Sequence, residues 1–93
     1  MIRSFGNKKT ERLWRRERVP SIDPSIQRTA LRKLRQVGAA ESLDDLRRPP
    51  GKRLEALKGD RLGQHSIRIN DQWRICFVWT ETGPEEVEIV DYH

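Results

Sequence analysis

The sequence predicts an α+β fold in which two N-terminal helices pack on one face of a curved antiparallel sheet, with residues 1–93 forming a single domain. Two observations predict this fold. Apolar residues recur at helical spacing in the first half of the chain, and short alternating runs separated by turn-forming residues fill the second half. Because the connections between these runs are short, neighbouring strands should be antiparallel.

The first half predicts a short strand over residues 2–5, a basic helix over residues 7–18 and a second helix that begins at Asp23. Asp23 followed by Pro24 is typical of an N-cap with proline in the first helical position. Gly38 is well suited to end this helix. The apolar residues between them recur at helical spacing and predict a core stripe, made of Ile26, Ala30, Leu31, Leu34 and Val37.

The second half predicts one helical turn and then four strands. Ser42 with Asp45 three positions later fits a capping box for a turn that ends at Leu46, before Pro49, Pro50 and Gly51 force a loop. The strands are expected over residues 53–57, 64–70, 73–80 and 86–92.

The charge of the chain is unevenly distributed. The formal net charge is +5, but residues 1–36 hold 11 Lys or Arg against 3 acidic residues, whereas residues 54–93 hold 4 against 8. A basic surface of this kind favours a polyanion such as nucleic acid, or an acidic partner protein, and a solvated helical face is the plainer interpretation. One cysteine, Cys76, excludes an internal disulfide, and the sequence shows neither a signal peptide, nor a membrane-spanning run, nor a zinc-ligand spacing. We expect a cytoplasmic protein without a metal or other cofactor.

Strand alternation predicts which side chains face away from the helices. If the aromatic and aliphatic residues of the third strand face the helices, Arg74 and Cys76 lie on the opposite face. The same alternation exposes Ser66 and Arg68 there, and it places Tyr92 in one cluster with Arg68 and Arg74. We expect this face to be free and to carry the chemistry.

Each candidate residue also has a plainer interpretation. Arg74 could balance Glu88 across the sheet, and His93 could be a loosely held chain end. The other plain readings are a rim aromatic for Tyr92, a core residue for His65, a solvated carboxylate for Glu55 and a space-filling side chain for Cys76.

Four segments of the chain stand together in a recognisable order and spacing: residues 1–5 (MIRSF), 54–60 (LEALKGD), 66–77 around Trp73 and Arg74, and the end Asp91, Tyr92, His93. Jointly they resemble the HigB toxins, a branch of the RelE and ParE superfamily of bacterial toxin–antitoxin systems. The resemblance covers nearly the whole chain. It implies two helices against an antiparallel sheet, translation-dependent cleavage of messenger RNA on the ribosome, and neutralisation by a helix-turn-helix antitoxin called HigA. The pair would bind operator DNA through the antitoxin and repress its own operon.

The resemblance also implies roles for individual residues. Arg74 would stabilise charge on the attacked phosphate, with Lys58 and Arg68 on flanking phosphates. Many HigB toxins carry a histidine in the stretch where this chain has Glu55 and Ala56. Because this chain lacks that histidine, the role of acid or base would pass to His93, which is the first choice. A carboxylate with a pKa of about 4.3 is a weaker base near neutrality than an imidazole at about 6.5. Asp91 would orient His93, and Glu55 is the second candidate for the general base. Tyr92 would stack on a nucleobase or assist proton transfer, and Gln72 would donate a hydrogen bond to a nucleobase or a phosphate.

The basic first helix is the expected contact with ribosomal RNA, through Lys8, Lys9, Arg12, Arg15 and Arg16. Two other functions remain open. ParE relatives share the fold but poison DNA gyrase without cutting RNA, and a plain nucleic-acid-binding module or co-repressor would show salt-sensitive binding without cleavage.

Overall fold

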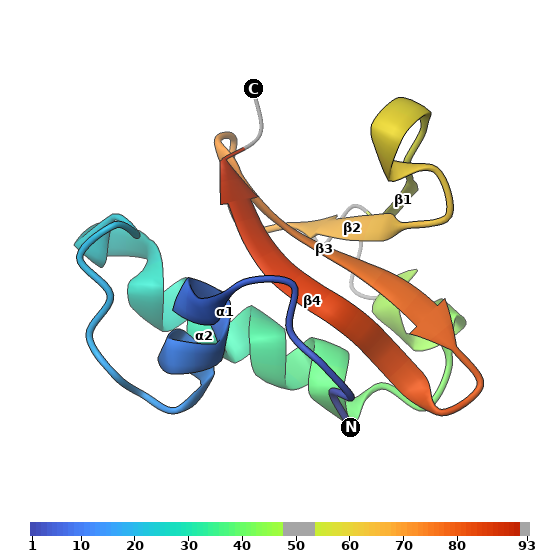
Figure 1. Cartoon of the computed structure of the whole chain (residues 1–93), viewed down its shortest axis with the longest axis horizontal. Helices are drawn as coiled ribbons and strands as arrows, with labels where there is room; N and C mark the ends of the chain where they lie inside the picture. Colours follow the sequence, from blue (N-terminus) through green and yellow to red (C-terminus); the bar gives the residue numbers. More distant parts are fainter. Residues whose placement is uncertain (48–53, 92–93) are drawn as a thin grey trace.

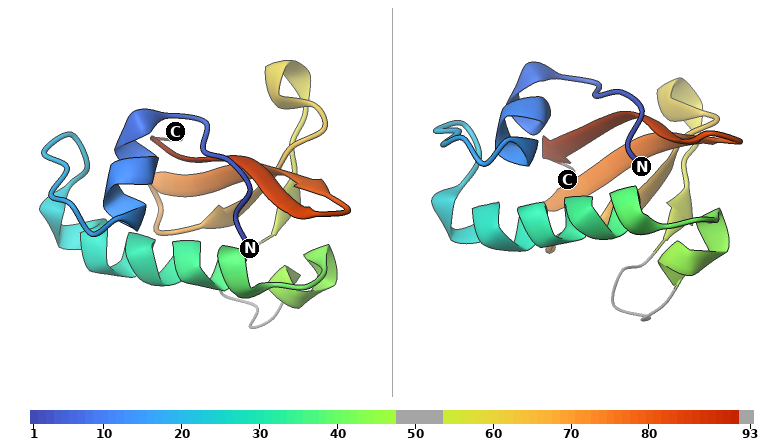
Figure 2. Two further views of the ribbon diagram at one scale, coloured as in Figure 1. Left: turned by 60° about the horizontal axis from the view of Figure 1, so that its bottom comes forward. Right: turned by 90° about the horizontal axis from the view of Figure 1, so that it is seen from below.

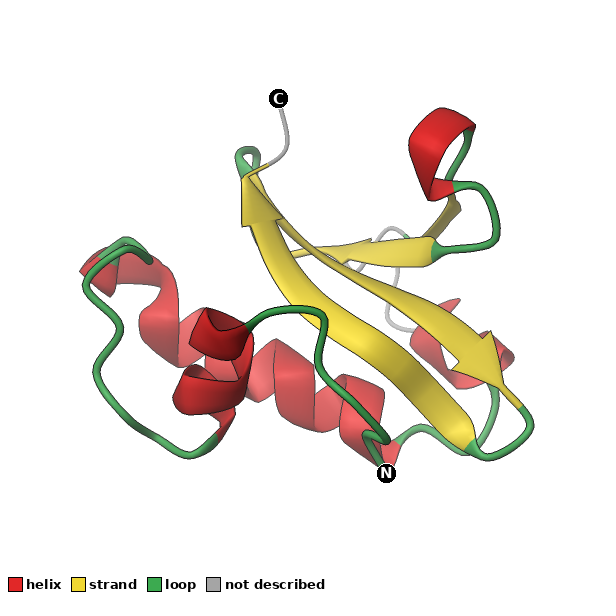
Figure 3. Ribbon diagram, viewed as in Figure 1, coloured by secondary structure: helices red, strands yellow, loops and turns green. Residues whose placement is uncertain are grey.

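The computed structural model describes residues 1–47 and 54–91, shown as a ribbon in Figure 1 and coloured by secondary structure in Figure 3. The helical elements are α1 (Lys8–Trp14), α2 (Pro24–Ala39) and the 3₁₀ turns η1 (Leu43–Arg47) and η3 (Gly59–Arg61). The strands are β1 (Glu55–Ala56), β2 (His65–Arg68), β3 (Trp73–Thr80) and β4 (Gly83–Asp91). This is the predicted α+β arrangement of two helices and an antiparallel sheet. None of the described helices is long and apolar enough to cross a bilayer.

The sheet follows the chain, in the order β1-β2-β3-β4, and every neighbouring pair is antiparallel. The long strands β3 and β4 slip register between Cys76 and Val78, opposite the segment that contains Glu86. Glu86 has a positive φ of 52°, and an extra residue of this kind bends a strand and increases its twist. The bulge therefore accounts for the curvature of the β3–β4 ribbon, which is plain in Figure 1.

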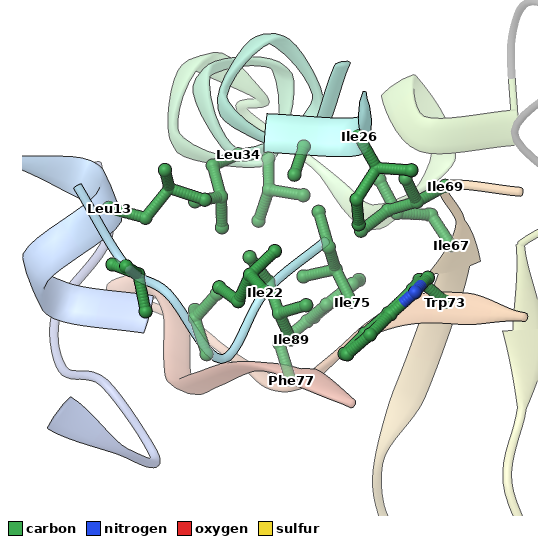
Figure 4. Close-up of a cluster of buried hydrophobic side chains, with 14 of the residues drawn as sticks. Leu13, Ile22, Ile26, Leu34, Ile67, Ile69, Trp73, Ile75, Phe77 and Ile89 are labelled. Atoms are coloured by element: carbon green, nitrogen blue, oxygen red, sulfur yellow. The ribbon is translucent and has the colours of Figure 1, made fainter. Parts of the chain in front are cut away.

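The two helices lie on one face of the sheet, as the two further views in Figure 2 show. Between helices and sheet lies one cluster of buried apolar side chains, drawn in Figure 4. Leu34 of α2 packs there with Ile75, Phe77 and Ile89 of the sheet, all of them fully buried. Alternation along β3 and β4 thus sends the large apolar residues toward the helices, as predicted.

Helix α1 is shorter than predicted. Asn7 is its N-cap and accepts a hydrogen bond from the Thr10 N–H at 2.9 Å, but the helix ends at Trp14 rather than residue 18. Arg16 adopts a φ of 66°, which stops the helix in the left-handed conformation common at helix ends. Thr10, which has no apolar signature, is fully buried because its hydroxyl donates to Asn7 Oδ1 and accepts from the Ile89 N–H on β4.

Helix α2 begins as predicted, with Asp23 as N-cap and Pro24 in the first position. Its predicted end at Gly38 is wrong, since the helix runs through Ala39. Gly38 serves packing instead: a Cβ there would lie 3.3 Å from the Trp14 ring and 3.4 Å from Ile2. The stripe is buried at Ile26, Ala30, Leu34 and Val37, and only half-buried at Leu31.

The N-terminal strand over residues 2–5 is not formed. A single parallel bridge joins Phe5 to Val87, and backbone hydrogen bonds from Arg3 and Gly6 tie this segment to β4. The third strand has its predicted bounds, whereas the strands predicted over 64–70 and 86–92 are observed as His65–Arg68 and Gly83–Asp91. The first is observed only as Glu55–Ala56, and Arg53, Pro49, Pro50, Gly51, Tyr92 and His93 lie outside the described residues.

Candidate functional site

Arg74 stands at the centre of the face that points away from the helices. It is only 8% exposed, and its Nε donates a hydrogen bond to Ser66 Oγ at 2.7 Å. Its Nη2 lies 3.9 Å from Glu55 Oε2. A charged group that leaves water requires such partners, and together they hold the guanidinium in one place and orientation.

Arg68 is the direct cross-strand partner of Arg74 in the β2–β3 register. Directly opposed side chains of an antiparallel pair point to the same face and approach closely, so two positive charges there repel. Asp71 pairs with Arg68 at the start of the turn that follows β2, which offsets one of the two charges. Glu55 Oε2, 3.9 Å from Arg74 Nη2, offsets part of the other charge. Two guanidinium groups on one face can share a bound anion through their planar donors, so this pair of arginines is suited to a phosphate.

The face is not free, contrary to the prediction. Ser66, expected to be exposed, is fully buried, and so are Cys76 and most of Arg74. The cause is a covering ion pair: Arg61, in η3, reaches across the sheet to Glu88 of β4, with Nη1 and Oε1 2.6 Å apart. Arg68 and Glu55, with 28% and 55% of their side chains exposed, are more open than Arg74.

The Arg61–Glu88 pair was missed by sequence reasoning, which considered Glu88 as a counter-ion of Arg74. Glu88 also lies 3.4 Å from the Asn7 amide nitrogen, and Arg61 donates to Gln64 Oε1 at 3.0 Å. Arg61 lies in a turn, where residue alternation carries no information about direction. Glu88 could have been placed on this face from its strand position, but its partner could not.

Cys76 is enclosed among these charges. Burial raises the pKa of its thiol, and Glu88 raises it further, whereas the nearby Arg61 and Arg74 act in the opposite direction. The thiol therefore stays protonated and weakly nucleophilic near neutral pH. This agrees with the interpretation of Cys76 as a space-filling residue.

Glu55 lies beside Arg74, and Lys58 follows in the loop between β1 and η3. Glu55 lies opposite Ser66 in the β1–β2 register, and its side chain is 55% exposed. Lys58 is exposed and precedes η3 in extended backbone conformation. The structure thus brings Glu55 to Arg74, while it shows Lys58 as a solvent-facing cation in the adjoining loop.

Gln72 and Asp91 meet at the end of the sheet. The Gln72 amide donates to Asp91 Oδ2 at 3.0 Å, and Asp91 lies opposite Trp73, one residue from the row that contains Arg74. The backbone of β4 therefore leaves the sheet beside the arginine pair. Tyr92 and His93 follow directly and lie outside the described residues, so their roles remain predictions.

The basic side chains of α1 divide into two groups. Arg12 and Arg15 form ion pairs with Glu17 and Glu11, each at 3.4 Å, which offsets part of their charge. Lys9 Nζ lies 5.9 Å from the centroid of the Trp73 ring, within range of a cation–π contact. Lys8 and Arg16 are exposed. Lys9 therefore places α1 next to the strand end that carries Trp73 and Asp91.

Among the described residues no group of three His, Cys, Asp or Glu side chains could hold a metal ion. Whether the protein uses a cofactor is not decided by this, and the predicted absence of one stays a prediction.

The arrangement of two helices and a four-stranded antiparallel sheet is that of a RelE-like toxin fold. Residues 3–93 match the family model described as RelE-like toxin of type II toxin–antitoxin system HigB. The chain is 38% identical over 82 residues to Toxin HigB-1 of Vibrio cholerae, which covers 87% of this chain and 86% of that protein. It is also 36% identical over 56 residues to an uncharacterized protein of Haemophilus influenzae, covering 60% and 55% of the two chains. The chain belongs to the HigB-like toxin family, and an antitoxin partner follows from that class.

Proposed function

We propose that this protein is a ribosome-dependent endoribonuclease that cuts messenger RNA during translation. The observation that carries the proposal is the fixed position of Arg74, which Ser66 holds while Arg68 lies directly opposite it in the β2–β3 register. Two opposed arginines would form a site for a phosphate diester, and membership of a HigB-like toxin family supplies the biological context.

Cleavage would proceed by attack of a ribose 2′-hydroxyl on the adjacent phosphorus. The P–O5′ bond breaks as the P–O2′ bond forms, which leaves a 2′,3′-cyclic phosphate and a 5′-hydroxyl. Negative charge increases on the non-bridging oxygens in the transition state, and the Arg74 guanidinium is placed to stabilise it. Arg68 and Lys58 would bind the flanking phosphates and set the register of the strand.

Two protons must move in this reaction, one from the attacking hydroxyl and one to the leaving oxygen. We assign His93 as the first candidate for this work because its imidazole titrates near neutral pH. Asp91 would orient His93, and Tyr92 would stack on a splayed base or assist the transfer. Glu55 is the second candidate base. Its carboxylate lies beside Arg74, and so it is within reach of the same phosphate.

The partners follow from the same proposal. A HigA-type helix-turn-helix antitoxin would neutralise the toxin, and the pair would bind operator DNA through the antitoxin. The ribosome would present the messenger RNA in the cytoplasm, with ribosomal RNA along α1 at Lys8, Lys9, Arg12, Arg15 and Arg16. Of these, Lys9 contacts Trp73, which precedes Arg74 in β3 and faces the helices. Gln72 would contact a base after release from Asp91.

The test is a primer-extension map of a translated messenger in a purified translation system, with and without ribosomes, followed by chemical analysis of the new ends. The proposal predicts new ends only when ribosomes translate, with 5′-hydroxyl groups that polynucleotide kinase labels without prior phosphatase treatment. Uncut messenger with blocked translation would instead indicate a binding inhibitor. No effect on translation would exclude the proposal and direct attention to gyrase or operator DNA.

A further inference from the structure

The helical side of the molecule has a hollow that is separate from Arg68 and Arg74 on the sheet. A hollow of about 390 Å³ lies between the end of α1, the α1–α2 connection and the outer side of α2. Leu13 and Leu31 provide its apolar floor, and its rim is formed by Arg16, Arg18, Arg28 and Arg35. We call it the arginine-rimmed hollow.

The charge of this hollow is poorly balanced within the chain. Its one lining carboxylate, Glu17, already pairs with Arg12 at 3.4 Å. Arg28 and Arg35 form no ion pair with any residue in the described ranges 1–47 and 54–91. They stand three and four positions from Leu31 on α2, so all three side chains lie on one face of the helix. This face combines unneutralised arginines with a half-exposed leucine.

The walls of the hollow are held in place before any partner arrives. The Gln27 amide donates to the backbone carbonyls of Val19 at 2.8 Å and Ile22 at 2.9 Å, which pins the α1–α2 connection to α2. Val19 and Ile22 are themselves fully buried. A site whose walls are already ordered loses little conformational entropy on binding.

Arg16 reaches the hollow because it directly follows the end of α1. Its φ of 66° is the left-handed conformation that ends the helix, and its exposed side chain lines the hollow together with Arg18.

We propose that the arginine-rimmed hollow is a docking site for an acidic peptide segment of a partner protein, which inserts one apolar side chain between Leu13 and Leu31. Carboxylates on either side of that anchor would pair with Arg28, Arg35 and Arg16, whose planar donor groups match a carboxylate. An RNA backbone would satisfy the arginines but would leave the apolar floor uncovered, and so the peptide fits both features of the hollow. The hollow is lined by residues of α1, α2 and their connection, so its occupant would not contact Arg74 on the sheet.

The test is fluorescence anisotropy with a short labelled peptide in which glutamates surround one leucine. Three further probes are a peptide with serine in place of leucine, one with lysine in place of every glutamate, and a single-stranded RNA of equal length. Binding is compared for the whole protein and its Arg28→Glu/Arg35→Glu, Leu31→Ser and Arg3→Glu variants. Arg3 is exposed and does not line the hollow, so Arg3→Glu is the charge control. Circular dichroism confirms that each variant folds, and Arg28→Gln/Arg35→Gln replaces the double charge reversal if that variant does not.

The proposal predicts that the glutamate–leucine peptide binds best, and that the double charge reversal and Leu31→Ser each weaken its binding by about tenfold or more while Arg3→Glu does not. Equal binding of the leucine and serine peptides would overturn the apolar anchor. Equal loss in Arg3→Glu would reduce the effect to general charge attraction and overturn the site. Tighter, competing binding of RNA would assign the surface to nucleic acid instead. Because no arm measures RNA cleavage, the result is independent of the proposed nuclease activity.

Discussion

Arg68 on β2 and Arg74 on β3 are direct cross-strand partners on the face that points away from the helices. A sheet does not gain stability by placing two guanidinium groups opposite each other. Ser66 accepts a hydrogen bond from Arg74, and Asp71 pairs with Arg68, so the repulsion between the two guanidinium groups is reduced but not abolished. A phosphate between them would complete the arrangement, which is why this pair carries the functional proposal.

Ser66 should act on the reaction through Arg74. Ser66→Ala removes the acceptor at 2.7 Å from Arg74 Nε, so the guanidinium loses part of its alignment while its charge stays. We expect the single-turnover cleavage rate on saturating translating ribosomes to fall about tenfold or more, with ribosome affinity unchanged. Ser21→Ala, at an exposed position, is the control. A wild-type rate in a folded Ser66→Ala variant would show that this hydrogen bond does not position Arg74 for cleavage.

The two candidate bases can be separated by substitution. Glu55→Gln keeps the size and hydrogen-bonding capacity of the side chain but cannot take up a proton, and at 55% exposure it should fold normally. If His93 moves the protons, Glu55→Gln retains most of the cleavage rate and His93→Ala loses about 10²–10⁴-fold. Single-turnover rates on translating ribosomes measure both. The reverse pattern would make Glu55 the base.

Thr10 should be essential for stability despite its modest size. Its buried hydroxyl donates to Asn7 Oδ1 at 2.6 Å and accepts from the Ile89 N–H at 2.9 Å, so it joins the N-cap of α1 to β4. Thr10→Val is nearly isosteric and leaves the buried Ile89 N–H unpaired, and we expect a loss of about 1–3 kcal/mol in the free energy of unfolding. Thr10→Ser, which keeps the hydroxyl, should lose less. Urea denaturation compares the variants, and a Thr10→Val variant that loses less stability than Thr10→Ser would assign the role of Thr10 to packing.

Asp23 should make stability depend on pH. The Ser25 backbone N–H donates to its carboxylate at 2.9 Å and lowers its pKa, and the Ser25 hydroxyl adds to this. Because the pKa is lower in the folded chain, the stabilisation is complete above the unfolded-state pKa and is lost as the pH falls through the folded-state pKa. Asp23→Asn keeps an acceptor without the charge. The urea midpoints of wild type and Asp23→Asn should therefore differ at pH 7 and converge in acid, and a constant difference would contradict this.

The fold was largely predictable because it depends on local signals. Asp23 and Pro24 mark the start of α2 by side-chain chemistry that acts within a few residues, and alternation in β3 gives both its bounds and its buried face. The errors arise where the chain meets distant segments. Gly38 continues the helix because the Trp14 ring and Ile2 need the space, and residues 2–5 form only a bridge because they meet β4 at its bulge.

The candidate site was predictable in part. Alternation correctly placed Arg74 and Arg68 on one face, but alternation does not predict how deeply a side chain on that face is buried, and so Ser66 was expected in solvent. The burial of this face results from Arg61, a turn residue whose ion pair with Glu88 crosses the face. No local pattern could reveal that pair, because it depends on how the loop after β1 folds back. The roles of Tyr92 and His93 stay predictions.

If Arg74 stabilises the transition state of messenger RNA cleavage, its replacement should slow the chemical step itself. This is measured as the single-turnover cleavage rate on programmed ribosomes for wild type, Arg74→Lys, Arg74→Ala and the control Arg32→Ala, with folding verified by circular dichroism. We expect a loss of about 10²-fold or more for Arg74→Ala, a partial loss for Arg74→Lys because an ammonium lacks the planar fork, and a wild-type rate for Arg32→Ala. A folded Arg74→Ala variant that cuts as fast as wild type would contradict this role of Arg74.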